Sequence, residues 1–172
     1  AIRALLYFEA LKVYGDFPII TQTLPTELET LQKASQRRPR NEVARFIISE
    51  LDSAIKYLRP AFPANQRLTK NAAQLLKSRV ALYEGTFEKH HRGTGRVPGD
   101  ATWPGKEKEW NKGKVFDQDA EVRFFLEQAM ASAKVVADAV SLTPNSHKTN
   151  PDLPTFSGWN PYYEQFASRS LD

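Results

Sequence analysis

The 172-residue chain has no cysteine, one methionine and no long apolar run. Without cysteine it offers no disulfide, no thiolate nucleophile and no sulfur ligand for zinc. Its apolar runs fall far short of the roughly 20 residues that a membrane-spanning helix requires. The composition therefore excludes disulfide-stabilised folds, cysteine enzymes and a membrane-spanning helix within these residues.

A strong excess of one charge is also lacking, since 24 Lys and Arg residues face 20 Asp and Glu residues for a net charge of +4. Proteins that bind nucleic acid gather positive charge on one face and often interleave it with aromatic rings that stack on bases. The densest basic cluster contains no aromatic residue and consists of Lys33, Arg37, Arg38, Arg40 and Arg45. A solvated region around a helix start is the favoured interpretation, and we expect no nucleic-acid partner.

Signatures of nucleotide-binding loops are incomplete. Gly93 and Gly95 begin a pattern that would need a third glycine where Pro98 stands, and no strand is expected before them. Gly105 and Lys106 lack both the earlier glycine and the following Ser or Thr of a phosphate-binding loop. We therefore expect no cofactor of this kind.

Catalytic and metal-binding patterns are equally sparse. His90 and His91 are adjacent, so on a helix they point about 100° apart and cannot share a metal ion as residues four apart would. No pair of carboxylates is marked as acid and base, and no serine stands in a nucleophile turn. The sequence predicts neither an enzyme nor a metal site, and it favours solvated histidines at a helix end.

Apolar residues recur at steps of three and four in four segments, which predicts four amphipathic helices. Proline, glycine and capping residues mark the ends of these helices. The predicted spans run from about Ile2 to Tyr14, from Pro39 to Pro60, from behind Thr69 to about His90, and from behind Asp117 or Asp119 to before Pro144. A further short helix is predicted behind Asn160, through Phe166.

Strand signals are nearly absent, because only the FPII segment from Phe17 is a plausible extended apolar run. The second and third helices are joined by about ten residues and their centres lie about 30 residues apart, near the spacing of tetratricopeptide repeats. Small Ala73 and Ala81 would let another helix approach the third one closely. We predict an all-α fold of tetratricopeptide-like antiparallel helical hairpins with long irregular loops.

The segment at positions 90–116 has no helical periodicity, and loops of this length often serve a function. It contains Trp103 and Trp110 together with Arg96, Asp100 and Asn111. Aromatic rings stack on the apolar faces of sugars, while Arg, Asp and Asn bond to sugar hydroxyls. The candidate ligand-binding residues are therefore Trp103, Trp110, Arg96 and Asn111. In the alternative, both tryptophans fold back into a small satellite core, and the sequence leaves both possibilities open.

Four stretches, taken in order, resemble landmarks of the SusD/RagB family of glycan-binding outer-membrane lipoproteins of Bacteroidetes. They are YGDFPII, RRPRNEVARFIISELDSAIKYL, QRLTKNAAQLLKSRVALYEGTF and FLEQAMASAKVVADA. The usual form of the first is Tyr-Gly-Asp-Val-Pro-Leu, so Phe17 and Ile19 are conservative departures, and Asn71 stands where glycine is common. The stretch NPYYEQF is similar to a further family segment. The resemblance spans nearly all of the chain, which would be a single helical segment, residues 1–172, from the middle of a larger SusD-like domain.

The resemblance implies that the landmark residues are structural. The first helix would begin a tetratricopeptide-like scaffold, and a sharp turn would direct the chain out of the packed helices. Tyr14, Gly15 and Asp16 would shape this turn rather than touch a ligand. Asp16 is expected to accept backbone N–H groups, as aspartates in turns do.

The resemblance also implies capture of an oligosaccharide, without catalysis or cofactor, at the outer-membrane cell surface. The ligand would pass to a SusC-like TonB-dependent transporter, and a lipid anchor outside these residues would provide the contact with the membrane. The family's glycan-contacting residues vary between members, so none transfers to this sequence. Two alternatives stay open: a tetratricopeptide-type scaffold for protein–protein interaction, and an enzyme whose catalytic carboxylates lie outside these residues.

Overall fold

The protein is helical in the computed structural model, which describes residues 1–60 and 67–141. The elements in chain order are α1 (Ile2–Tyr14), α2 (Leu28–Ala34), α3 (Arg40–Tyr57), α4 (Lys70–His90), the 3-10 helix η2 (Glu109–Asn111) and α5 (Gln118–Ala139). Within the described ranges, extended pairing is limited to one isolated bridge between Phe17 and Arg38. The predicted all-α fold is confirmed.

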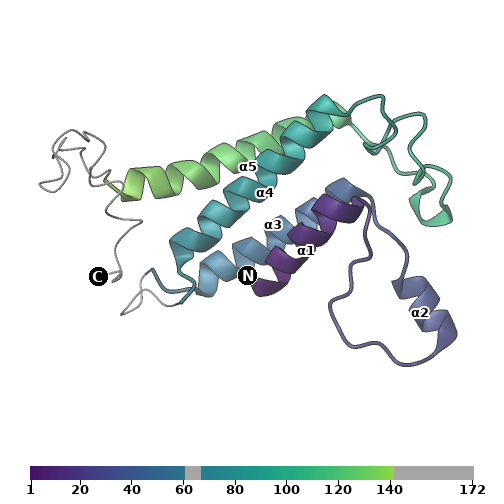
Figure 1. The fold of residues 1–172 in the computed structure, drawn as a ribbon, viewed down its shortest axis with the longest axis horizontal. Helices are drawn as coiled ribbons and strands as arrows, with labels where there is room; N and C mark the ends of the chain where they lie inside the picture. The colour runs from purple at the N-terminus through teal and green to yellow at the C-terminus, as the bar shows by residue number, and fades with distance from the viewer. Residues whose placement is uncertain (61–66, 142–172) are drawn as a thin grey trace, which may run out of the picture.

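Consecutive long helices run antiparallel, with α1 beside α3, α3 beside α4 and α4 beside α5 (Figure 1). As a result, the end of α1, the start of α3, the end of α4 and the start of α5 all lie at one end of the bundle (Figure 1). The segment that carries α2 and the long segment between α4 and α5 both leave from this end, which we call the loop end.

Local capping explains where the helices begin and end. The α1 helix ends at Gly15, whose φ of 66° few other residues adopt and whose N–H donates to the Leu11 carbonyl. The Thr69 hydroxyl accepts from the Ala72 N–H at 3.2 Å at the start of α4. Of the two candidate caps for α5, Asp117 is the one used, since its Oδ1 accepts two backbone N–H groups.

The sequence reading differs from the structure in three places. The α2 helix lies in a stretch that we expected to be irregular, and none of its seven residues is buried. Pro39 is the N-cap of α3 rather than its first residue. The segment at positions 90–116 contains η2. The short helix predicted behind Asn160 lies outside the described residues.

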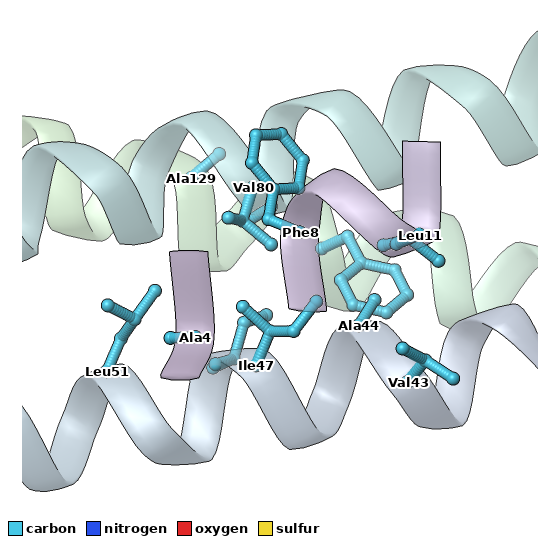
Figure 2. Packing of buried hydrophobic residues seen from close by; sticks show 12 residues of the cluster. Ala4, Phe8, Leu11, Val43, Ala44, Ile47, Leu51, Val80 and Ala129 are labelled. Atoms are coloured by element: carbon cyan, nitrogen blue, oxygen red, sulfur yellow. The ribbon is translucent and has the colours of Figure 1, made fainter. Parts of the chain in front are cut away.

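The core lies where α1 and α3 face α4 and α5 (Figure 2). Its side chains come from all four long helices and include Ala4, Phe8, Leu11, Val43, Ala44, Ile47, Leu51, Val80, Ala81, Phe125 and Ala129. Ala73 and Ala81 are both fully buried, as their predicted place in a helix contact requires.

Small residues let α4 and α5 approach closely. A Cβ at Gly85 would lie 3.0 Å from the Leu126 side chain on α5. The Ser78 hydroxyl on α4 donates to the Ala129 carbonyl on α5 at 2.9 Å. Within the described part of the chain, none of the helices is apolar over the length that spanning a bilayer would take.

Candidate ligand-binding site

Asp16 joins three segments at the loop end. It follows the Gly15 turn, and its Oδ1 accepts the backbone N–H of Arg40, the first residue of α3, at 2.9 Å. Its Oδ2 accepts the indole Nε1–H of Trp103 at 2.9 Å. Burial raises the pKa of the Asp16 carboxyl, although both hydrogen bonds and the nearby Arg40 act in the opposite direction. Asp16 accepts a backbone N–H group, as expected, but the donor lies 24 positions away and is not the local donor of an aspartate in a turn.

A buried ion pair stands beside this junction. The Arg40 guanidinium donates to both oxygens of Glu84 on α4, at 2.7 Å each, and the two side chains are 4% and 0% exposed. The guanidinium carbon of Arg40 also lies 3.4 Å from the centre of the Phe87 ring. This two-point geometry and the ring contact are the interactions in which arginine surpasses lysine. Arg40 therefore fixes the start of α3 against the end of α4.

Glu88 lies one turn beyond Glu84 and is 1% exposed. Burial, and then the neighbouring Glu84 carboxylate, raise the pKa of Glu88 to about 9. Glu121 on α5 acts in the same direction, while Arg40 opposes it. At neutral pH, Glu88 is thus protonated, and the Glu84–Glu88 pair carries one negative charge opposite Arg40.

The glycine-rich part of the long loop folds around the carboxylate of Asp100. Gly93 and Gly95, both with φ of 77°, donate their backbone N–H groups to the two oxygens of Asp100 at 2.9 and 3.0 Å. Gln118 donates to the same carboxylate from the start of α5. Burial alone would raise the pKa of Asp100, but the hydrogen bonds donated to it hold that pKa below its usual value. The Asp100 carboxylate therefore organises the loop instead of facing a ligand.

The two loop tryptophans differ in exposure. Trp103 is 4% exposed, meets the edge of Phe116 and leaves so little room that a Cβ at Gly105 would lie 2.1 Å from its ring. Asn111 is also buried and donates to the Gly105 carbonyl at 2.9 Å. Trp110 is half-buried, and its Nε1–H donates to the Arg37 carbonyl at 2.9 Å. The Trp103 surroundings therefore resemble a satellite core, whereas Trp110 keeps part of its ring accessible.

A hollow of about 600 Å³ opens between the α1 turn, the segment before α3 and the long loop. Its aromatic lining consists of Tyr14, Phe87, Trp103 and Trp110. Its charged lining consists of Lys12, Arg37, Arg40, Arg96, Lys108 and Asp16. A second, smaller hollow shares Ser35 and Trp110 with the first and continues along α2 past Gln32 and Lys33. Trp110 therefore stands between two adjoining hollows.

Three of the four predicted site residues meet at this hollow. Trp103, Trp110 and Arg96 line it, whereas Asn111 supports the loop from inside and is not part of the lining. The sequence analysis assigned Tyr14, Gly15 and Asp16 to the turn rather than to ligand contact, yet all three line the hollow, and of its basic lining residues Arg96 alone was predicted as a site residue. Their proximity depends on contacts such as Asp16 with Trp103, which join segments 87 positions apart, so no local pattern announces them. Among the described residues, no cluster of three His, Asp or Glu side chains is placed to hold a metal ion.

Comparison with known proteins gives a likeness in fold. No protein-family model matches the sequence, and no curated protein matches it significantly. Among solved structures, the chain is similar to a SusD-like protein from Bacteroides fragilis, with a TM-score of 0.53 and 22% sequence identity. The match covers 86% of this chain and 21% of that one, so the chain spans about a fifth of the SusD-like structure's length. The fold of the described helices is thus SusD-like.

Proposed function

We propose that this chain belongs to a protein that binds oligosaccharides without transforming them, and that the hollow beside Trp110 is its binding site. The observation that carries the proposal is the combination, in a SusD-like fold, of an accessible indole ring with hydrogen-bonding side chains around one hollow. A sugar ring offers apolar C–H faces to an aromatic ring and hydroxyl groups to the surrounding polar atoms.

Trp110 is held in a defined position for this role. Its Nε1–H is bonded to the Arg37 carbonyl, which fixes the indole plane before a ligand arrives. Trp103 would contribute indirectly, because its bond to Asp16 fastens the loop that carries Trp110 and Arg96. Asn111 would act in the same way through Gly105.

The wider role follows from the family resemblance together with the fold. We propose that the intact protein captures its glycan at the outer-membrane surface, anchored by lipid outside these residues, and passes it to a SusC-like TonB-dependent transporter. The likeness to a SusD-like structure favours this role over a protein-interaction scaffold. No step of the proposal uses a catalytic residue or a cofactor.

The test is a glycan-array screen of the intact protein, followed by titration of the bound glycan against two variants. Trp110→Ala removes the accessible ring and should weaken binding by at least about tenfold. Tyr57→Ala is the matched control, because Tyr57 is 78% exposed at the far end of α3 from the hollow. Equal affinity of both variants and the parent would place binding elsewhere, and shortening of the glycan during incubation would refute a purely binding role.

A further inference from the structure

We propose that the ligand of this hollow is an acidic oligosaccharide, whose carboxylate or sulfate groups are bound by the unpaired cations of the hollow's rim. This inference rests on the proposed function and specifies its ligand class. It starts from the charges around the hollow, which are strongly unequal although the chain as a whole carries only +4.

Three exposed cations at the rim form no ion pair. Among the described residues, Arg37, Arg96 and Lys108 take part in no ion pair, and their side chains make no hydrogen bond. Other arginines of the loop end are paired: Arg45 with Glu121 at 2.9 Å, and Arg92 with Asp119 at 2.6 Å. Arg37, Arg96 and Lys108 therefore present three charges to the same hollow, whereas these neighbouring arginines are neutralised by carboxylates.

The carboxylate that lines the hollow already has hydrogen-bond donors at both oxygens. Asp16 is the one carboxylate among the lining residues, and its two oxygens accept the Arg40 N–H and the Trp103 indole N–H. Arg40 itself is neutralised by Glu84. The charge of Arg37 attracts the Asp16 carboxylate, but one carboxylate does not balance the rim cations, and an anionic ligand would reduce their mutual repulsion.

The arrangement suits an acidic sugar better than other anions. Arginine guanidinium groups bind carboxylate and sulfate oxygens through two parallel hydrogen bonds. Trp110 lies beside Arg37, since its indole bonds to that residue's carbonyl, so an apolar ring face and a cationic group are offered side by side. Nucleic acids would need a longer basic track with several stacking rings, and the hollow offers two accessible rings, those of Trp110 and Tyr14.

The experiment uses the intact protein and a panel of matched glycan pairs. Each uronic-acid polymer is paired with its methyl ester, and each sulfated glycan with its desulfated form, so that the members of a pair differ only at the acidic group. At about 0.05 M salt the acidic member of at least one pair should bind about tenfold more tightly, as a few exposed ion pairs allow, and about 0.5 M salt should erase most of this difference. The pair that binds distinguishes a carboxylate ligand from a sulfate ligand.

Two variants test whether the rim arginines cause the preference for the acidic glycan. Replacing both rim arginines (Arg37→Gln with Arg96→Gln) should reduce the affinity for the acidic member about tenfold and leave that for the neutral member unchanged. Arg79→Gln is the control, because Arg79 is an exposed arginine of α4 outside the hollow's lining, and it should change neither affinity. Circular dichroism and thermal unfolding confirm that the variants stay folded.

The outcomes separate this inference from the proposed function. Equal binding of acidic and neutral members, or binding of neutral glycans alone, overturns the inference and leaves oligosaccharide binding intact. An acidic preference that survives the double substitution also overturns it. Binding of no glycan in the panel overturns both proposals.

Discussion

The helical core and the loop end of this protein are held together by different interactions. In the core, fully buried apolar side chains such as Leu11, Ile47 and Phe125 come from different helices and share one cluster. At the loop end, single polar contacts join distant segments, for example Asp16 with Trp103 and Arg37 with Trp110. Loss of one apolar contact in the core leaves many others, whereas few contacts hold each segment at the loop end, so the loss of one should loosen that segment more. We therefore expect the hollow to open more readily than the helices unfold.

The largest expected effect comes from the ion pair that links the two regions. Arg40→Met leaves the Glu84 carboxylate buried without its counterion, which should lower the free energy of unfolding at neutral pH by about 3–5 kcal/mol. Chemical denaturation of the intact protein measures the change. Arg45 pairs with Glu121, but the Arg45 side chain is 41% exposed. Arg45→Met should therefore lower the free energy of unfolding by less than about 1 kcal/mol. Similar losses at both positions would show that burial of the pair is not what matters.

The raised pKa of Glu88 should make the stability of the protein depend on pH. Its carboxyl stays protonated in the folded chain up to about pH 9 but ionises near 4.5 when unfolded, so the folded state binds more protons between these values. Stability should therefore fall as the pH rises through this window. Glu88→Gln cannot ionise, so it should match the parent near pH 5, exceed it in stability at pH 8 and flatten the slope.

The control for that comparison is Glu127→Gln, which removes an exposed carboxyl from α5 and should leave the slope as it is. Urea unfolding at several pH values supplies the data. A parent protein whose stability is constant from pH 5 to pH 8, or a Glu88→Gln variant with the parent's slope, would contradict a protonated Glu88.

Asp16 tests whether the hollow depends on a single side chain. Asp16→Ala leaves the Arg40 N–H and the Trp103 indole N–H without acceptors, at an expected cost of about 1–3 kcal/mol. Hydrogen exchange should increase in the loop around Trp103 and Trp110, while amides in the middle of α4 keep their protection. Uniformly faster exchange would mean that the loop end and the core unfold together, which would contradict the contrast between them.

The same contrast between core and loop end explains which parts of the structure could be predicted from the sequence. The α1 helix was predicted at its observed bounds because its signals are local: a run of helix-forming residues and the Gly15 stop. Thr69 was identified as a cap for the same reason. The α2 helix was missed because it buries no residue. Local patterns thus sufficed wherever a helix buries one face.

The candidate site could be predicted only in part. A tryptophan in a long loop is a visible signal, and Trp110 and Arg96 do line the hollow. Arg37 and Lys108 were missed because nothing near them in the sequence reveals that the α2 segment and the long loop meet. Asp100 accompanies the predicted site residues in the sequence and could have bonded to sugar hydroxyls, but the folded loop directs backbone N–H groups to both of its oxygens.

The smallest expected effect compares two glycines of this loop that share a backbone conformation. Gly93 and Gly95 both have φ of 77°, so alanine at either position costs about 1 kcal/mol in backbone strain. A Cβ at Gly93 meets nothing within 4 Å, whereas one at Gly95 would lie 2.8 Å from the Thr102 hydroxyl and 3.1 Å from the Thr102 carbonyl oxygen. Gly95→Ala should therefore destabilise the loop more than Gly93→Ala, by about 1 kcal/mol in addition.

Local hydrogen exchange at the loop amides resolves so small a difference, because it reports opening of the loop without global unfolding. The double variant Gly95→Ala with Thr102→Gly removes the obstructing hydroxyl and should recover part of the loss, though not the part that comes from the Thr102 carbonyl. Equal effects of the two single substitutions would mean that the loop shifts freely around Thr102. In that case the Asp100 contacts alone, and not close packing, would keep the rim of the hollow in place.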